Sequence, residues 1–214
     1  MDEHVPPVQT TLLSIQTPDA LERAVQALRR GEVIAFPTDT VYGLGAHAFL
    51  PDAVRRLYEV KRRPLHVPIP LLLPNAQALT QLCEEIPPLT WEIAAHFWPG
   101  ALSLVLRRSS LVPDMVTAGG STVAVRVPDH PWVRELCRRL GAPLAATSAN
   151  RHCEAELVTA AEVQAALGGL ISLILDGGPC PGGIPSTVLD LTLSPPAILR
   201  RGPITAEQLA PWIG

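Results

Sequence analysis

Four short polar segments stand next to apolar runs of the chain, and they hold the residues best suited to bind an anion. The segments are PTDT at 37–40, KRR at 61–63, TSAN at 147–150 and PST at 185–187. Loops at strand ends that carry hydroxyls, amides and free backbone N–H groups can converge on a polyanionic ligand. Taken singly, each segment is better explained by helix capping or a turn, because Ser, Thr and Asn are favoured at such positions.

The KRR segment differs from the others because it crowds three cations at the expected C-terminal end of a helix. Cations are favourable there for the helix dipole alone. The alternative interpretation is that Lys61 and Arg63 flank the phosphates of a nucleotide, whereas Arg62 faces solvent. Of the 17 basic residues, sixteen are arginines and Lys61 is the single lysine. Lys61 is therefore a candidate for a position that requires a compact ammonium rather than a guanidinium.

Several common catalytic and binding motifs are absent from the sequence. It contains no Walker A motif, no G-x-G-x-x-G after a strand, no G-x-S-x-G and no H-E-x-x-H. A net charge of −3 gives no global cationic field for nucleic acid or an anionic membrane. No C-x-x-C pair occurs, so buried thiols are expected rather than a zinc site or a disulfide framework at Cys83, Cys137, Cys153 and Cys180.

Hydrophobic periodicity predicts strands interleaved with helices in one mixed α/β sheet. Thr17, Pro18 and Asp19 have the pattern of a helix start, with Thr17 as the N-cap. The segment 67–73 is expected to be an edge strand, because its prolines cannot donate hydrogen bonds to a neighbouring strand. The other strands are expected at 33–36, 102–107, 123–127, 144–147, 170–176, 186–191 and 197–200. Helices are expected at 17–31, 51–64, 75–84, 89–97, 131–140, 159–167 and 205–212.

The chain has the size and composition of one substantial domain. It has 214 residues, of which 47% are hydrophobic and 17% charged, with no internal repeat or linker. The acidic start, interrupted by Pro6 and Pro7, lacks the features of a secretory signal. No uncharged apolar stretch is long enough for a membrane span. A soluble, cytoplasmic protein without membrane association is expected.

Seven segments occur in the order seen in the YrdC-like family of threonylcarbamoyl-AMP synthases. They are FPTDTVYGLG, KRRP, WPGALSLVL, VAVRVPDHP, TSAN, STVLDL and ILRRGPI, and the resemblance extends from about residue 15 to 212. It implies a single α/β domain, a twisted mixed β-sheet flanked by helices around a deep groove. Residues 1–14 would form an N-terminal extension, and residues 15–214 the YrdC-like catalytic domain.

The resemblance also implies a reaction, that of an L-threonylcarbamoyladenylate synthase, which is a nucleotidyltransferase. L-threonine, bicarbonate and ATP would give threonylcarbamoyl-AMP and pyrophosphate, for N6-threonylcarbamoyladenosine at position 37 of tRNAs that read ANN codons. ATP would enter as a substrate with Mg²⁺, without a dedicated metal site or a tightly bound cofactor. A downstream threonylcarbamoyl transferase complex would take the product, and a weak tRNA contact is compatible with this role.

Site residues follow from the resemblance position by position. Thr40, Arg126 and Ser186 match threonine contacts, with the planar guanidinium of Arg126 suited to both oxygens of a carboxylate. The catalytic phosphate cluster would comprise Lys61, Arg63, Ser148 and Asn150. The ATP-binding residues would be these four together with Thr122 and Arg200. The acidic residues Asp39, Asp176 and Asp190 are expected to be structural.

The sequence departs from the family pattern at several places. Val67 stands where the family has an asparagine, Leu72 where it has a polar residue, and Ala101 where proline is common. The segment RHCEAELVT at 151–159 lacks the usual small, flexible loop with its serine. A YrdC-fold paralogue is the alternative, acting as an RNA-binding module or with another adenylation substrate. Only nine aromatic residues are present for base stacking, which favours the enzyme.

Overall fold

Short apolar runs of the sequence form a ten-stranded sheet in the structure, a computed structural model that describes residues 8–151 and 154–213. The order across the sheet is β1-β8-β2-β3-β7-β4-β6-β5-β9-β10. Strands β1, β2 and β8 run parallel to one another, as do β4 with β6 and β5 with β9, and the other neighbours are antiparallel. The strands are β1 Thr11–Ser14, β2 Ile34–Phe36, β3 Gly43–His47, β4 Leu71–Leu72, β5 Leu102–Arg107, β6 Thr122–Arg126, β7 Leu144–Ser148, β8 Leu173–Asp176, β9 Thr187–Asp190 and β10 Ala197–Arg200.

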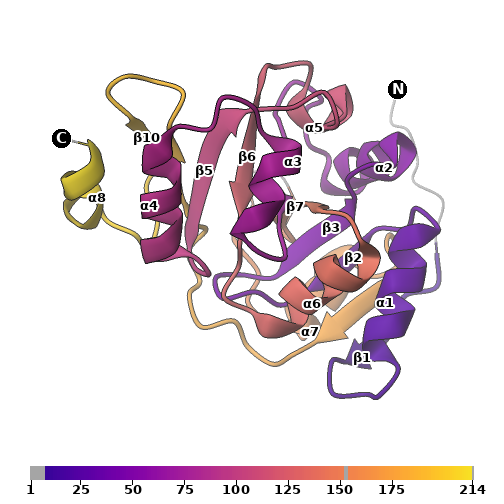
Figure 1. The fold of residues 1–214 in the computed structure, drawn as a ribbon. Helices are drawn as coiled ribbons and strands as arrows, with labels where there is room; N and C mark the ends of the chain where they lie inside the picture. Colours follow the sequence, from indigo (N-terminus) through magenta and orange to yellow (C-terminus); the bar gives the residue numbers. More distant parts are fainter. Residues whose placement is uncertain (1–7, 152–153, 214) are drawn as a thin grey trace.

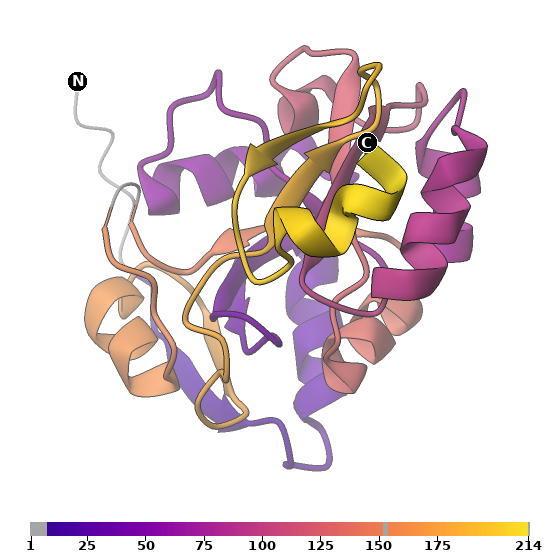
Figure 2. The same cartoon turned by 90° about the vertical axis from the view of Figure 1, so that its left-hand side faces the viewer.

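Helices flank this mixed sheet, as the sequence predicts. Figure 1 shows α1 and α6 packed on each other, and Figure 2 shows α8 beside β10 at the opposite end of the sheet. Within residues 8–151 and 154–213, no helix has both the length and the apolar character needed to cross a membrane. The helices are α1 Ala20–Arg29, α2 Pro51–Lys61, a 3-10 turn Ala76–Ala78, α3 Leu79–Leu82, α4 Pro88–Phe97, α5 Asp114–Thr117, α6 Pro131–Leu140, α7 Ala160–Leu167 and α8 Ala206–Ile213.

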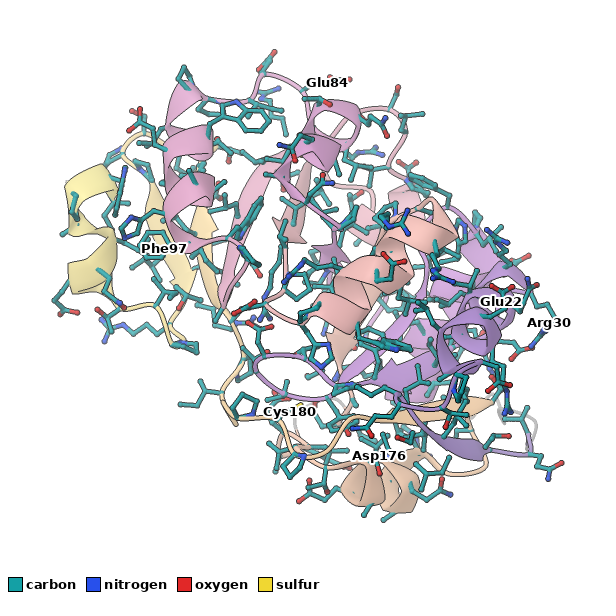
Figure 3. The ribbon with its side chains drawn as sticks, turned by 60° about the horizontal axis from the view of Figure 1, so that its bottom comes forward. Glu22, Arg30, Glu84, Phe97, Asp176 and Cys180 are labelled. Atoms are coloured by element: carbon teal, nitrogen blue, oxygen red, sulfur yellow. The ribbon has the colours of Figure 1, made fainter. Side chains whose placement is uncertain are left out.

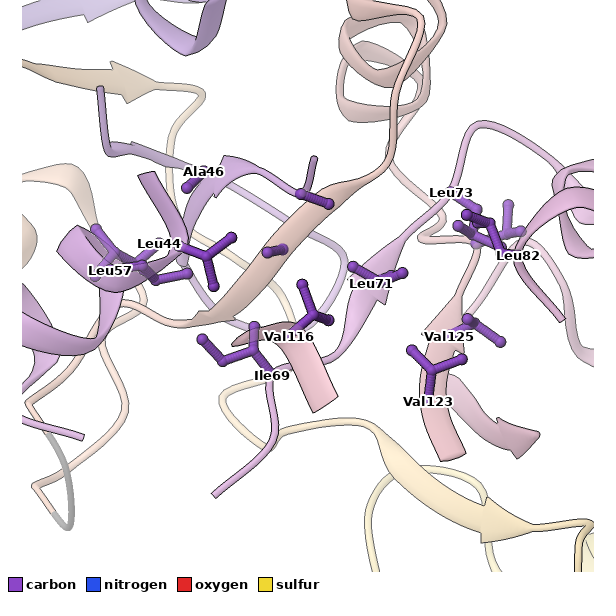
Figure 4. Close-up of a cluster of buried hydrophobic side chains, with 14 of the residues drawn as sticks. Leu44, Ala46, Leu57, Ile69, Leu71, Leu73, Leu82, Val116, Val123 and Val125 are labelled. Carbon is purple, nitrogen blue, oxygen red and sulfur yellow. The ribbon is translucent and has the colours of Figure 1, made fainter. Parts of the chain in front are cut away.

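Two hydrophobic cores fix the faces of the sheet. The larger core packs residues of α2, α3, α4, α5, α7 and α8 against the strands, and the smaller one packs α1 and α6. Val123 and Val125 of β6 point into the larger core (Figure 4). Side chains alternate along a strand, so Thr122 and Arg126 of β6 lie on the opposite face. This alternation brings a charged residue to one end of a strand in the middle of the sheet.

Two sequence-based expectations are wrong. The expected edge strand at 67–73 is β4, an internal strand that pairs with both β7 and β6. Pro68 and Pro70 precede Leu71, so the ladder keeps its backbone donors and tolerates the prolines. The first helix begins at Ala20 with Asp19 in place of Thr17 as N-cap, because Thr17 instead closes a turn through its carbonyl to the Ala20 N–H.

The expected N-terminal extension, residues 1–14, contributes to the sheet. Residues 11–14 form β1, which pairs in parallel with β8. Residues 1–7 lie outside the described residues, as do His152 and Cys153. The strand at one edge of the sheet therefore comes from the segment that precedes the expected catalytic domain.

Candidate functional site

A pocket with charged and hydroxyl groups in its lining lies where β3, β7, β6 and β5 meet the loops at their ends. We call it the arginine pocket, because Arg63, Arg126 and Arg200 all line it. The remaining lining is largely hydroxyl and small apolar groups: Thr38, Thr40, Val41, Tyr42, Gly43, Pro70, Leu72, Ser103, Ala146, Thr147, Ser148, Pro185 and Ser186. The residues come from segments far apart in sequence, so the sheet order assembles the pocket.

The PTDT segment is the connection of the β2–β3 hairpin, and one hydroxyl shapes it. Thr38 Oγ1 accepts hydrogen bonds from the backbone N–H groups of Thr40 and Val41 and donates one to the Val41 carbonyl. Thr40 Oγ1 lies 3.0 Å from Thr38 Oγ1. This side-chain turn replaces backbone pairing in the loop and fixes the buried Thr40 hydroxyl at the pocket.

The loop after β8 supports the same turn. Tyr42 Oη donates a hydrogen bond to the Gly178 carbonyl, and the Gly183 N–H donates to the Thr40 carbonyl. Burial raises the pKa of Tyr42 to about 12, so its hydroxyl remains a donor at neutral pH. Asp176 and Cys180, on β8 and in this loop, are labelled in Figure 3.

Arg126, the last residue of β6, is held on three sides. Its Nε donates to the Gly100 carbonyl at 2.8 Å, its Nη2 to Asp39 Oδ1 at 2.7 Å and its Nη1 to Thr40 Oγ1 at 3.1 Å. The side chain is 7% exposed, and burial lowers its pKa while Asp39 opposes that shift. The pair is thus a buried ion pair with one defined geometry.

Lys61 binds the TSAN segment, of which Thr147 and Ser148 line the arginine pocket. Its Nζ donates to the carbonyls of Ser148 and Asn150 at 2.7 Å each and lies 3.1 Å from Asn150 Oδ1 and 3.3 Å from Ser148 Oγ. Lys61 is 3% exposed. Asn150 Nδ2 donates to the Glu154 carbonyl and anchors the loop that follows. The ammonium therefore fixes the backbone that presents Ser148 to the pocket.

Arg63 and Arg200 approach from two other segments. Arg63 donates to the carbonyls of Val67 and Pro68. Arg200 donates to the carbonyl and the hydroxyl of Ser186, and Ser186 Oγ lies 2.9 Å from Ser103 Oγ. Burial lowers the pKa of both arginines. For Arg200, the negative charge of Glu156 opposes this shift, and the positive charges of Arg126 and Arg63 add to it. Arg200 is therefore close enough to the other two guanidiniums to be repelled by both, which favours an anion beside it.

The structure brings most of the expected site residues together. Thr40, Arg63, Arg126, Ser148, Ser186 and Arg200 line the arginine pocket, whereas Lys61 and Asn150 lie against its TSAN wall. Thr122 does not line it: it pairs with Arg107 at the other end of β6, roughly 13 Å from Arg126 at the strand rise per residue. It shares the face of Arg126, so only a ligand extended along β6 reaches both.

Two residues without an expected functional role belong to the site. Ser103 of β5 is buried, lines the pocket and contacts Ser186. The sequence gives one indication of this role: Ser103 is a hydroxyl residue within the apolar segment 102–107, and side chains alternate between the two faces of a strand. Asp39, expected to be structural, forms the ion pair with Arg126.

The described residues include no group of three or more His, Cys, Asp or Glu that could hold a metal ion. Cys83, Cys137 and Cys180 are buried free thiols, in agreement with the prediction for these three. Burial raises the pKa values of Cys83 and Cys137 to about 12. Among the described residues, the lining of the arginine pocket supplies cations and hydroxyls and includes no cysteine.

Comparison with known proteins gives consistent relationships over most of the chain. The profile of the Sua5/YciO/YrdC family, described as telomere recombination, matches residues 26–202. The chain is 43% identical over 206 residues to a threonylcarbamoyl-AMP synthase of Bacillus subtilis, covering 96% of this chain and 59% of that protein. It is 42% identical over 187 residues to the Pyrococcus abyssi threonylcarbamoyl-AMP synthase, covering 87% and 55%.

A solved structure also matches the fold. The crystal structure of P. abyssi Sua5 complexed with L-threonine superposes with a TM-score of 0.91 at 38% identity, over 97% of this chain and 61% of that one. The chain thus spans between about half and three-fifths of the length of these relatives.

Proposed function

The chain belongs to the Sua5/YciO/YrdC family, and from this membership we propose that it is an L-threonylcarbamoyladenylate synthase. It converts L-threonine, bicarbonate and ATP to threonylcarbamoyl-AMP, pyrophosphate and water. The observation that carries the proposal is the arginine pocket, where three guanidiniums from β6, β10 and the α2–β4 connection meet a ring of hydroxyls. Two curated relatives, at 42% and 43% identity, bear the name of this activity.

Threonine binds at the Arg126 side of the pocket. The related P. abyssi Sua5 was crystallised in complex with L-threonine, which supports this class of substrate. Arg126 retains N–H donors on its terminal nitrogens that can bond both oxygens of a carboxylate. Thr40 and Ser186 place hydroxyls nearby for the polar groups of the amino acid.

The reaction requires no protein nucleophile. The amine of threonine and bicarbonate condense to a carbamate with loss of water. A carbamate oxygen then attacks the α-phosphorus of ATP, the bond between the α- and β-phosphates breaks, and pyrophosphate leaves. The protein holds the reactants together and stabilises the charge that develops on the leaving group. Arg63 and Arg200 bind the phosphates of ATP. Lys61 and Asn150 fix the backbone of the TSAN segment, from which the Ser148 hydroxyl donates a hydrogen bond to the phosphates.

Mg²⁺ would be carried by the nucleotide. Mg²⁺ keeps several waters and is commonly held by substrate phosphates with few protein ligands. That mode suits a pocket whose charged lining is cationic. When bound, the ion would neutralise part of the triphosphate charge, and Thr122, along the same face of β6, would contact the nucleotide away from the reacting phosphate.

The product links the chain to tRNA modification. A downstream threonylcarbamoyl transferase complex would transfer the group to adenosine 37 of tRNAs that read ANN codons, in the cytoplasm. Direct tRNA contact would be weak, because the net charge of −3 provides no broad phosphate-binding surface.

Pyrophosphate release tests the proposal. The purified chain is incubated with ATP, L-threonine and bicarbonate, and release is compared with reactions that omit one substrate, with mass spectrometry of the adenylate. Release that requires both threonine and bicarbonate is the expected result. Release without threonine, or none at all, would favour a paralogue with another substrate or an RNA-binding role.

A further inference from the structure

Asp39 holds Arg126 from behind the arginine pocket. Arg126 lines the pocket, whereas Asp39 and Gly100 line a neighbouring hollow together with His130 and Pro179. Two of the three anchors of the guanidinium, Asp39 Oδ1 and the Gly100 carbonyl, therefore lie on the rear side. Of the three anchors, the Thr40 hydroxyl is the one on the side of the pocket.

We propose that Asp39 is a positioning residue that orients Arg126 for the carboxylate of the amino-acid substrate, an inference that rests on the proposed function. A guanidinium has five N–H donors, and three are engaged by Gly100, Asp39 and Thr40. One N–H on each terminal nitrogen is left. The rear anchors fix the plane of the guanidinium, so these two donors face the pocket as a fork for two carboxylate oxygens.

Charge and orientation predict opposite effects when Asp39 is changed. If the negative charge of Asp39 only offset that of Arg126, its removal would strengthen the attraction for a substrate carboxylate. If Asp39 acts by orientation, removing its oxygen frees the guanidinium to rotate and weakens binding. Burial favours orientation, since Arg126 and Asp39 are 7% and 13% exposed and form one defined contact of 2.7 Å.

Three variants separate the two effects. Asp39→Ala removes the acceptor, Asp39→Asn removes the charge but keeps an oxygen for Arg126 Nη2, and Asp129→Asn is the matched control. Asp129 also borders the rear hollow but is exposed and pairs with Arg134. Steady-state kinetics with threonine and ATP varied in turn are combined with calorimetric binding of L-threonine and L-threoninamide, the analogue without a carboxylate.

Orientation predicts a change confined to threonine. Asp39→Ala should raise the KM for threonine by about tenfold, the scale of one lost charge-assisted hydrogen bond. The KM for ATP, kcat at saturating threonine and the affinity for L-threoninamide should change less than about twofold. Asp39→Asn should fall between wild type and Asp39→Ala, and Asp129→Asn should match wild type.

Several results would overturn the inference. Tighter threonine binding in Asp39→Asn would show that charge dominates. Because Asp39→Asn retains the acceptor, it still provides this test if Asp39→Ala does not fold. Equal weakening of threonine, L-threoninamide and ATP would show a general structural role. A wild-type protein that neither binds threonine nor needs it for pyrophosphate release would instead refute the proposed function, and the two failures are therefore distinguishable.

Discussion

Replacing Lys61 tests whether the single lysine is required as an ammonium. Its Nζ is buried and faces four oxygens of Ser148 and Asn150 at 2.7–3.3 Å. Lys61→Met keeps a similar stem but leaves these acceptors without that donor. Each buried acceptor left unpaired costs about 1–3 kcal/mol, and the ammonium no longer has to be desolvated. We expect a net loss of about 3 kcal/mol in the free energy of unfolding, which most domains tolerate.

Lys61→Arg keeps the charge and changes its shape. The planar guanidinium is larger and presents its donors in one plane, whereas the ammonium directs three donors at acceptors that surround it. Overpacking at a buried position costs about 1–3 kcal/mol. Because the displaced backbone carries Ser148, kcat/KM should fall by at least about 100-fold, equivalent to about 2.8 kcal/mol.

The assay pairs urea denaturation with threonine-dependent pyrophosphate release. Arg62→Lys is the control, since Arg62 is the adjacent cation, is exposed and adopts a left-handed backbone that lysine can keep. Arg62→Lys should change the activity by less than about twofold and the free energy of unfolding by less than about 0.5 kcal/mol. If Lys61→Arg has wild-type stability and activity, the reasoning from the ammonium is refuted.

Three further predictions follow from buried groups. Ser103→Ala should raise the KM for threonine, for ATP or for both by about threefold to tenfold in steady-state assays, because Ser186 loses its hydroxyl partner. If neither KM changes, this prediction is contradicted. Burial, the largest cause, lowers the pKa of His130 despite Asp39. At pH values between the ordinary pKa near 6.5 and the lowered pKa of the folded state, the unfolded chain binds more protons than the folded chain. The contribution of neutral His130 to stability is therefore present above pH 6.5 and declines below it. The free energy of unfolding, measured with urea at pH 7.5 and 5.5, should fall less between these two pH values in His130→Gln than in wild type. An equal fall would refute this assignment. Cys137, whose pKa burial raises to about 12, should resist thiol alkylation in native protein and react in urea, as peptide mapping can measure.

Periodicity predicted the sheet well where local pattern and burial agree. The runs at 33–36, 102–107 and 170–176 contain β2, β5 and β8. Segment 67–73 shows the limit of such reasoning. Its prolines indicated an edge, but the paired residues are Leu71 and Leu72 alone, and which strands flank them depends on contacts with distant segments. Strand position within a sheet is a tertiary property that a local proline does not determine.

The site was predictable as a set of residues more than as a geometry. The polar segments indicated an anion site, and six of the expected residues do line one pocket. The partner of each side chain was not visible in the sequence. Asp39 and Arg126 are 87 positions apart, and Ser103 and Ser186 are 83 apart. Their contacts arise from strand order and register, which bring β5 between β6 and β9.

The KRR segment shows how one local turn gives three neighbouring cations different environments. Lys61 ends α2 and is buried against TSAN, whereas Arg62, with φ of 52°, reverses the chain and is exposed. Arg63 then enters the arginine pocket, held by the Val67 and Pro68 carbonyls. A continued helix would turn these side chains about 100° apart along one cylinder and could not bury Lys61 while aiming Arg63 at the pocket. The left-handed residue therefore separates a cation that supports the wall of the site from one that faces its ligand, which explains why Lys61 and Arg63 need not be interchangeable.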